Sequence, residues 1–378
     1  MRGHIRKRGN KYSIVIDIGR DHLGKRKQKW FSGFDKKKEA EKELPKLIQQ
    51  LELGEIVASE NITFADYMEK WLERKKKNVT YGTYRHYEAY SRNHIIPSLG
   101  KWQTNKVKDY HIASFMDSLE DKGLSKRTQR HIYRILSSAI AAGAQYGLNK
   151  NLFSKTDAPK VPKKKIEFWN EEEVQKFLES LFEEKHYMPI YLALITGMRQ
   201  GEVLGLRWDS IDLEQRILSV QQQLKIKEQL DGRGRYELTN VLKTPTSYRT
   251  ITLDEETVSL LKRHKSEQEK RQNRILSKYA DYNLVNATDT GNYITPPNIN
   301  KVFWRTIKNS GVKRISFHSL RHTHATLLLK MGIHPKVVQE RLGHASIQIT
   351  LDTYSHLIPG MQSAAAEMLG QLFNKKRD

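Results

Sequence analysis

A short segment rich in proline and lysine divides the sequence into two unlike parts. It spans residues 151–166 and contains two prolines and a run of three lysines: Pro159, Pro162, Lys163, Lys164 and Lys165. Proline interrupts helices and strands, and this composition is typical of a linker. We therefore expect a basic linker over residues 154–166, with a domain boundary there. The length of 378 residues agrees with two or three domains, since a domain usually has roughly 100–200 residues.

Two kinds of pattern follow one another before the linker. Over residues 1–60, alternating apolar residues in Tyr12–Ile18 predict a strand with one apolar face, and a basic turn then leads into a further strand. Apolar residues at helical spacing between 36 and 53 predict a helix that covers a small three-stranded sheet. Residues 61–153 show helical spacing throughout, which predicts an all-helical domain.

Helix and strand patterns are mixed beyond the linker. Strand-like runs at Ile217–Leu224 and Arg249–Leu253 lie among helices, which predicts a mixed α/β domain over residues 167–359. In residues 360–378 an apolar stripe at helical spacing is formed by Ala365, Leu369, Leu372 and Phe373. We expect a tail helix whose stripe must be buried somewhere. The expected fold class is therefore multidomain α+β.

The charge of the chain indicates its partner. It carries 66 Lys and Arg against 43 Asp and Glu, a formal net charge of +23, which predicts a polyanionic partner. No apolar run reaches the roughly 18 residues that a membrane-spanning helix needs, and no signal peptide is recognisable. We therefore expect double-stranded DNA and no membrane as partner, and a cytoplasmic, nucleoid-associated protein. Cysteine is absent, which excludes disulfides, thiolate metal sites and a cysteine nucleophile.

Candidate DNA-binding cations lie in a basic turn, at the start of a helix and in the linker. They are Lys25, Arg26, Lys27, Lys126, Arg127, Arg130, Lys163, Lys164 and Lys165. The helix near Lys126 turns apolar from Ile135 on, so that it has one basic and one packed face, as expected of a helical domain that clamps DNA. For the first sixty residues a merely solvated basic surface is the alternative, because charge runs often only face water.

Four segments of the last domain carry residues suited to phosphate chemistry. The first, residues 196–206, places Arg199 at a glycine-marked turn between apolar helices, where its planar guanidinium can bond two phosphate oxygens. The others contribute, in chain order, Lys243 in an expected hairpin, His318 with Arg321, and His344 followed ten residues later by Tyr354. Each residue alone has a simpler explanation, because a lone arginine near a turn is usually a surface residue and a lone tyrosine is usually core.

The four segments together, in this order and spacing, resemble the tyrosine recombinase (phage integrase) family over essentially the whole chain. The resemblance implies that Tyr354 attacks the scissile phosphate and forms a 3′-phosphotyrosyl intermediate. Arg199 and Arg321 would hold the non-bridging oxygens and supply the positive surrounding that a tyrosine of ordinary pKa about 10 needs. Because the phosphotyrosyl bond keeps the energy of the broken one, no cofactor is expected.

The family implies roles for the remaining residues as well. Lys243 would be the general acid that protonates the departing 5′ oxygen, and His318 would assist proton transfer at the nucleophile. His344 would hydrogen-bond the phosphate. Glu202 resembles the family's structural acid, which orients neighbouring catalytic groups without touching substrate.

The three-part layout also resembles integrases of mobile elements. The resemblance assigns arm-type DNA binding to residues 1–60, a SAM-like core-binding role to residues 61–153 and catalysis to residues 167–359. The last two would form a C-shaped clamp on DNA and assemble into a homotetramer in which the tail docks on a neighbouring protomer. A host DNA-bending protein and an excisionase are further expected partners.

Other interpretations of these residues remain open. Five histidines could build a metal site: His318, His322, His324, His344 and His356. The absence of cysteine and the charge of Arg321 inside the cluster argue against it, and we expect no metal. A Xer-like or resolvase-type recombinase, a type IB topoisomerase and a non-enzymatic DNA-binding regulator are the alternative functions.

Overall fold

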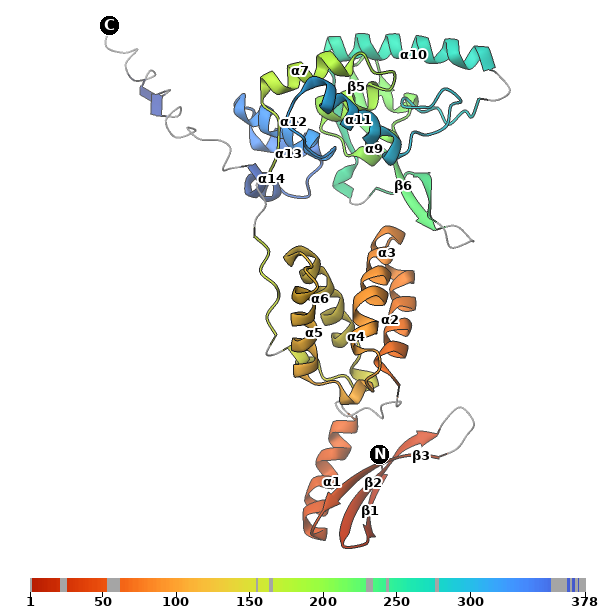
Figure 1. Cartoon of the computed structure of the whole chain (residues 1–378), viewed down its shortest axis with the longest axis vertical. Helices are drawn as coiled ribbons and strands as arrows, with labels where there is room; N and C mark the ends of the chain where they lie inside the picture. Colours follow the sequence, from red (N-terminus) through yellow and green to blue (C-terminus); the bar gives the residue numbers. More distant parts are fainter. Residues whose placement is uncertain are drawn as a thin grey trace. The chain divides into compact units, whose positions relative to one another are not determined.

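The structure, a computed structural model, describes most of the chain. The described residues are 2–20, 26–52, 62–153, 156–162, 166–228, 234–242, 245–275, 279–354, 366–367, 369–370 and 373. The chain separates into two compact units, Met1–Lys163 and Lys164–Asp378 (Figure 1). The expected multidomain α+β class is confirmed.

The first described part is a three-stranded antiparallel sheet with one helix. Strands β1 (Arg2–Arg8), β2 (Lys11–Arg20) and β3 (Arg26–Phe34) lie in the order β1-β2-β3, and α1 (Lys37–Glu52) packs on them. Ile14 and Ile16 on β2 are fully buried together with Ala40 of α1. The expectation of a single apolar face was wrong, because Val15 on the other face is only 1% exposed. Val15 lies opposite Trp30 of β3 in the register, so the centre of the middle strand is covered on both sides.

The second described part is all-helical. It consists of α2 (Phe64–Asn78), α3 (Tyr81–Tyr90), a π-helical turn (Ser91–Ile95), α4 (Ile96–Leu99), α5 (Asp109–Asp121) and α6 (Lys126–Ala141), with short 3₁₀ turns at Thr104–Lys106, Ala144–Tyr146 and Lys150–Phe153. Helix α2 begins where Thr63 and Asp66 cap each other's backbone N–H groups. One face of α2 is buried through Tyr67 and Trp71 at helical spacing, which anchors the helix in the core.

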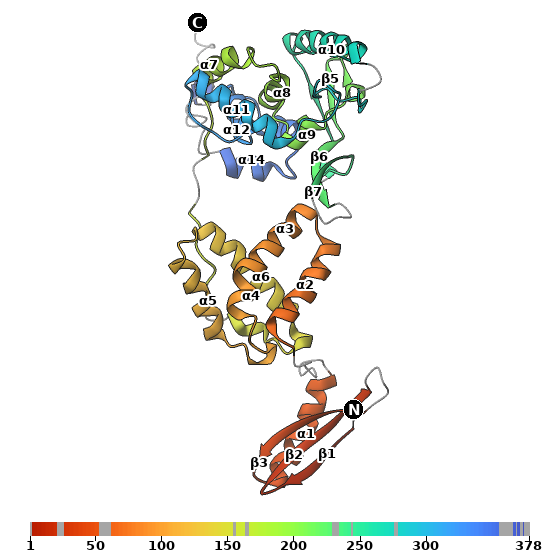
Figure 2. The same ribbon diagram turned by 45° about the vertical axis from the view of Figure 1, so that its right-hand side comes forward.

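The second unit, Lys164–Asp378, combines helices with two small sheets. Its helices are α7 (Glu171–Leu181), α8 (Met188–Thr196), α9 (Gln200–Leu204), α10 (Glu255–Ile275), α11 (Pro296–Ser310), α12 (Ser319–Lys330), α13 (Pro335–Leu342) and α14 (Ile347–Tyr354). Strands β4 (Ile211–Asp212), β5 (Ile217–Val220) and β8 (Arg249–Thr252) form one antiparallel sheet in the order β4-β5-β8. Strands β6 (Gln223–Glu228) and β7 (Gly234–Thr239) form a hairpin that extends from this unit (Figure 2).

A large aromatic core holds helices of the second unit in place. Trp169, Phe177 and Phe303 are fully buried against one another, with ring centroids 4.4–6.0 Å apart. The Trp169 backbone N–H donates to the Thr323 hydroxyl at 3.1 Å, and its indole N–H donates to the Lys313 carbonyl at 2.7 Å. The first of these bonds ties α12 to the core through Thr323.

Candidate active site

Two glycines in left-handed conformation position the candidate site residues of the second unit. Gly197 ends α8 with φ +67°, and Gly343 ends α13 with φ +68°. A Cβ on Gly197 would lie 2.7 Å from side-chain atoms of both His324 and Leu342, so a larger residue would clash there as well as be strained. These turns let α8 and α13 end close together, with Arg199 following the first and His344 the second.

Arg199 is held by a carboxylate one turn further along the chain. Glu202 accepts a hydrogen bond from the Arg199 backbone N–H at 2.9 Å and one from its guanidinium Nη1 at 2.7 Å. Arg199 Nη2 also donates to the Gly343 carbonyl at 3.4 Å, while its side chain keeps 34% of its surface exposed. The guanidinium is thus oriented by protein groups and still accessible to a ligand.

The same carboxylate binds a second arginine from β8. Arg249 Nη2 donates to Glu202 at 2.8 Å, and both side chains are almost completely buried, at 5% and 3% exposure. Burial alone would raise the pKa of Glu202, but the positive charges of Arg249 and then Arg199 outweigh it and lower that pKa. The three residues therefore carry one net positive charge, with Glu202 ionised.

Arg321, in the first turn of α12, is a further buried cation, and one of its donors is unpaired within the described residues. It is 3% exposed; its Nη1 donates to the Gly197 carbonyl at 2.9 Å, but its buried Nη2 has no hydrogen-bond partner among the described atoms. Burial and the charges of Arg199 and Arg249 lower the pKa of Arg321 to about 9, so it remains protonated at neutral pH. A buried cation with an unpaired donor is unfavourable as long as no anion is bound. Arg321 therefore favours the binding of an anion such as a phosphate.

Two neutral histidines lie in the field of these arginines. Burial, then Arg321 and Arg199, lower the pKa of His318. The same causes lower the pKa of His344 to about 3. The Nδ1 atom of His344 is 2.9 Å from the Thr350 hydroxyl, which leaves Nε2 as the ring atom for a ligand. Each ring can therefore hydrogen-bond a phosphate without adding charge.

Tyr354 ends α14 and is buried, with 1% of its surface exposed. Burial raises its pKa to about 12, and the charge of Arg321 acts in the opposite direction. Its hydroxyl lies 2.7 Å from Nδ1 of His322, which follows Arg321 on α12. The phenol therefore carries its proton in this structure and is positioned by a hydrogen bond.

The structure brings most of the predicted site residues into one cluster. Hydrogen bonds and electrostatic coupling connect Arg199, Glu202, His318, Arg321, His344 and Tyr354. Lys243 lies outside the described residues. The hairpin expected around it is therefore not tested; the described strand β7 ends at Thr239.

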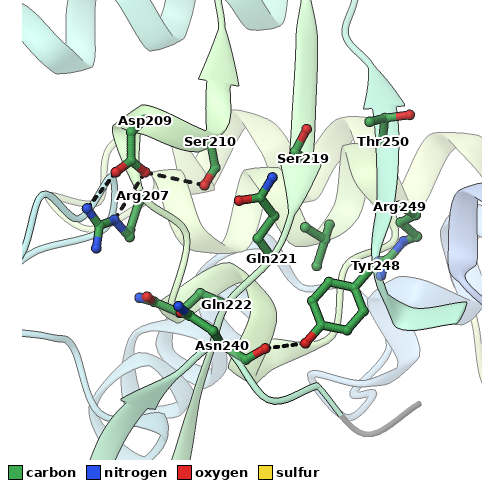
Figure 3. A pocket seen from close by; sticks show the side chains of 11 residues that line it. Arg207, Asp209, Ser210, Ser219, Gln221, Gln222, Asn240, Tyr248, Arg249 and Thr250 are labelled. Atoms are coloured by element: carbon green, nitrogen blue, oxygen red, sulfur yellow. Dashed lines mark hydrogen bonds and ion pairs between the residues drawn. The ribbon is translucent and has the colours of Figure 1, made fainter. Parts of the chain in front are cut away.

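A polar pocket of about 770 Å³ lies beside the arginine cluster and shares Arg249 with it. Figure 3 shows Asn240 and Tyr248 pointing toward each other across one side of this pocket. The Tyr248 hydroxyl donates to the Asn240 carbonyl and lies 3.4 Å from the Leu242 backbone nitrogen. Tyr248 therefore links the start of β8 to the described residues that follow β7.

Sequence reasoning missed two residues of the cluster, Arg249 and His322. Arg249 alternates with Ile251 on β8 and with Leu253 just after it, and a strand position that shares the buried face is a signal for an inward-pointing arginine. His322 stands four residues after His318, a spacing that puts both on one face of a helix. From the sequence alone, His322 is named only among the histidines of a possible metal site. His324, by contrast, bonds the Leu194 carbonyl and Arg341 and ties α12 to neighbouring elements.

The candidate DNA-binding cations are placed only in part. Lys25 and the linker lysines Lys163, Lys164 and Lys165 lie outside the described residues, as does the side chain of Lys27. Arg26 pairs with Asp17 at 3.1 Å, Lys126 pairs with Glu120 at 2.6 Å, and Arg130 donates to the Pro159 carbonyl at 3.3 Å. Arg127 is exposed.

The described part of the chain has two further properties that bear on function. It contains no group of three or more His, Asp or Glu side chains arranged to hold a metal ion. It also has no helix that is long and apolar enough to cross a membrane. Of the predicted tail stripe, Leu369 and Phe373 are described, and both are exposed, whereas Ala365 and Leu372 lie outside the described residues.

Comparison with known proteins finds relatives for each part of the chain. Residues 167–360 match the phage integrase family, residues 63–120 match the phage integrase N-terminal SAM-like domain, and residues 4–51 match an arm DNA-binding domain. A tyrosine recombinase XerC-like protein of Caldanaerobacter subterraneus subsp. tengcongensis is 32% identical over 377 residues, with 96% of each chain covered. The ICEBs1 integrase of Bacillus subtilis is 26% identical over 369 residues, covering 96% of this chain and 97% of the relative.

Solved structures show the same fold. The integrase of the Tn1549 transposon, in complex with transposon right end DNA, superposes with a TM-score of 0.67 at 24% identity, covering 81% of this chain and 98% of that one. A lambda integrase dimer bound to a core site superposes with a TM-score of 0.55 at 18% identity, covering 93% of each chain.

Proposed function

Because the chain belongs to the phage integrase family of tyrosine recombinases, we propose that it integrates and excises a mobile element by strand exchange through Tyr354. The family membership expected from the four motifs is confirmed, and the protein is a site-specific DNA recombinase. The observation that carries the residue assignment is Arg321, a buried cation with an unpaired donor. It is electrostatically coupled to both Arg199 and Tyr354.

The proposed cleavage step is a transesterification at one DNA phosphate. The Tyr354 oxygen loses its proton to a neighbouring histidine and forms a bond to phosphorus while the bond from phosphorus to the 5′ oxygen breaks, which leaves a 3′-phosphotyrosyl enzyme. Arg199 and Arg321 bind the two non-bridging oxygens, whose negative charge grows in the transition state. Lys243 gives a proton to the departing 5′ oxygen. The reverse reaction with a second DNA end rejoins the strands.

Two further residues support this step. His344 donates a hydrogen bond to the phosphate through Nε2, since its Nδ1 is engaged with Thr350. Glu202 does not touch the substrate: it holds Arg199 on one side and Arg249 on the other and so fixes the direction of the Arg199 guanidinium. His318 lies in the field of both phosphate-binding arginines and serves as a neutral hydrogen-bond partner near the phosphate.

The amino-terminal sheet is proposed to bind arm-type DNA sites. Arg6 and Arg8 are exposed on β1 and lie over the Trp30 ring, 5.9 and 5.5 Å from its centroid. Stacking of this kind orders long cationic side chains on an open sheet face and leaves their charge available to phosphates. The match of residues 4–51 to an arm DNA-binding domain supports this role.

The larger assembly is part of the proposal. We assign arm binding to residues 1–60, core binding to residues 61–153, a linker to 154–166, catalysis to 167–359 and a tail to 360–378. Four protomers would assemble on two DNA sites, assisted by a host DNA-bending protein and directed by an excisionase. The similar Tn1549 integrase was solved with transposon end DNA and with circular intermediate DNA, which supports the choice of mobile-element DNA. A bacterial nucleoid is then the place of action.

The test uses DNA from the junctions of the element that carries this protein. Sequencing the junctions in the host chromosome and in the excised circle defines the two partner sites. The purified protein is then assayed for covalent adduct formation, two-site strand exchange and relaxation of supercoiled plasmid. Adduct and strand exchange support an integrase; relaxation without exchange would indicate a type IB topoisomerase. Binding without any adduct would leave only a DNA-binding regulator.

A further inference from the structure

His322 is the described residue that touches the nucleophilic oxygen. Its Nδ1 lies 2.7 Å from the Tyr354 hydroxyl, and the two rings are 5.7 Å apart between centroids. The family resemblance gives proton transfer at the nucleophile to His318, but no hydrogen bond joins His318 to Tyr354 within the described residues. The hydrogen bond to the Tyr354 hydroxyl is therefore made by His322, one helical turn after His318.

The two histidines of α12 face different groups. His318 precedes α12 and is coupled to Arg321 and Arg199, the two arginines of the phosphate site. The ring of His322 packs edge-on against that of His318, with centroids 5.0 Å apart and an interplanar angle of 88°. One histidine thus stands on the phosphate side of the site and the other at the tyrosine. His322, and not His318, is therefore placed for proton transfer at the tyrosine.

The protonation states suit a proton acceptor at position 322. Burial, followed by the charges of His318 and Arg321, lowers the pKa of His322 to about 4, so the ring is neutral at physiological pH. Tyr354 carries its proton, since burial raises its pKa to about 12. A neutral ring with the proton on Nε2 presents a lone pair at Nδ1, which can accept the hydrogen bond of the phenol.

Other groups around the tyrosine are less suited to accept its proton. Glu202 is ionised, but its two oxygens are held by Arg199 and Arg249. Asp352 is exposed and accepts a hydrogen bond from Gln348 at 2.6 Å. Arg321 can only donate. His322 is therefore the neutral base in contact with the hydroxyl among the residues that the structure describes.

We propose that His322 is a catalytic residue that accepts the proton of Tyr354 during cleavage and returns it during rejoining. This inference rests on the proposed function of Tyr354 as nucleophile. As the phenol oxygen bonds to phosphorus, its proton moves to Nδ1 of His322, and the imidazole becomes imidazolium. The departing 5′ oxygen takes its proton from a separate acid. In rejoining, a 5′ hydroxyl attacks phosphorus and gives its proton back to that acid, now deprotonated, while the tyrosine oxygen leaves with the proton from His322.

The imidazolium formed in this way is next to a phosphoryl group that is gaining negative charge. That charge offsets the repulsion from Arg321, which adds to the effect of burial in lowering the pKa of His322 when no phosphate is bound. Transfer in step with bond formation also avoids a free phenolate, which would be unfavourable for a buried tyrosine. General base catalysis of this kind usually contributes about 10²–10⁴-fold to the rate.

The experiment measures single-turnover adduct formation on a nicked duplex that carries the mapped junction sequence. The variants are His322→Ala and His322→Asn, each combined with either tyrosine or 3,5-difluorotyrosine at position 354. Difluorotyrosine is a stronger acid, so it depends less on a base. Lys330→Gln, an exposed position on the same helix, is the matched control, and thermal unfolding is recorded for each protein.

We expect His322→Ala to slow adduct formation by about 10²-fold or more, and difluorotyrosine to reduce that penalty to about tenfold or less. His322→Asn can still hydrogen-bond the phenol but is a very weak base, so it should fold normally and remain slow. Equal penalties with both phenols would contradict the proposal, because a purely structural role does not depend on phenol acidity. Full activity of His322→Asn, or a faster His322→Ala, would also overturn it.

The wild-type protein separates failure of this inference from failure of the proposed function. If wild type forms no adduct, Tyr354 is not a nucleophile on this DNA and the function itself is wrong. If wild type forms the adduct and His322→Ala equals it, only the role of His322 is wrong.

Discussion

Two groups of positive side chains in this molecule are held in opposite ways. In the catalytic unit, Arg249 and Arg321 are at most 5% exposed and bound by hydrogen bonds from several elements. In the amino-terminal sheet, Arg6 and Arg8 are exposed and lie over one aromatic ring. In the proposed function the first group binds one phosphate in a fixed position, whereas the second supplies positive charge to a surface. Net charge alone, at +23, does not distinguish the two.

This difference between the two groups follows from their exposure to solvent. A buried guanidinium has given up water and depends on each protein partner, so loss of one group changes the whole site. An exposed cation is hydrated and screened by salt, so its contribution to DNA binding is small and adds to that of its neighbours. Substitutions in the catalytic unit should therefore have large, specific effects, and those in the sheet small, salt-dependent ones.

The largest effect is expected for Tyr354→Phe. This change removes only the nucleophilic oxygen, so adduct formation should fall below detection while binding to the core site stays nearly unchanged. Gel mobility of the complex and denaturing electrophoresis of the adduct are measured on the same sample. An adduct at the wild-type level would mean that another residue attacks the DNA.

Loss of the buried cation should come next. Arg321→Ala removes the donor that has no protein partner, and cleavage should slow by on the order of 10²–10³-fold or more, by analogy with lost oxyanion donors. Single-turnover cleavage of the junction duplex gives the rate. Near wild-type recombination by Arg321→Ala would remove this residue from the phosphate site.

Glu202→Gln tests the buried carboxylate between two arginines. Leaving Arg199 and Arg249 without their counter-charge should lower the free energy of unfolding by on the order of 3 kcal/mol at neutral pH. Because the folded pKa of Glu202 lies below the ordinary 4.5, the carboxylate's contribution is complete above that pH and is lost as the pH falls through the lower folded pKa. Urea unfolding at several pH values should therefore show a difference between variant and wild type that shrinks in acid. A constant difference would contradict the ionised triad.

Removal of residues 1–60 tests the exposed group as a whole. Cleavage of a core site should be spared, whereas integration that depends on arm sites should fall, because phosphate contacts and bridging between sites are lost together. The two assays are run on the same DNA with and without arm sites. Equal integration by the truncated and full chains would show that the sheet does not bind arm sites.

The smallest effect is expected for single cations of the sheet. Arg6→Ala should weaken arm-site binding only a few-fold and reduce the slope of log affinity against log salt by about one contact. Binding measured across a salt series gives that slope. A large loss with no change of slope would mean that Arg6 reads a base or supports the fold instead of contacting a phosphate.

Local sequence patterns predicted those helices and strands whose buried residues recur at the period of the element. The helix that begins at Phe64 and the strand around Ile14 and Ile16 follow from spacing alone, because each buries residues at its own period. Val15 was misjudged, since burial of the second sheet face depends on the cross-strand Trp30 and not on β2 itself. The site residues were proposed from motifs, but spacing cannot show that Arg249 shares a carboxylate with Arg199, 50 residues away in the chain. Nor can it show which of two histidines on α12 reaches the tyrosine.

The central claim is that Tyr354 becomes joined to a 3′ phosphate within a receptor of buried arginines. The most direct measurement is proteolysis of the trapped adduct, followed by mass spectrometry of the peptide that carries the nucleotide. Our account predicts a single modified peptide with the nucleotide on Tyr354, linked through the 3′ phosphate, and a free 5′ hydroxyl on the other DNA end. A nucleotide on any other residue, or a 5′ phosphate link, would contradict it.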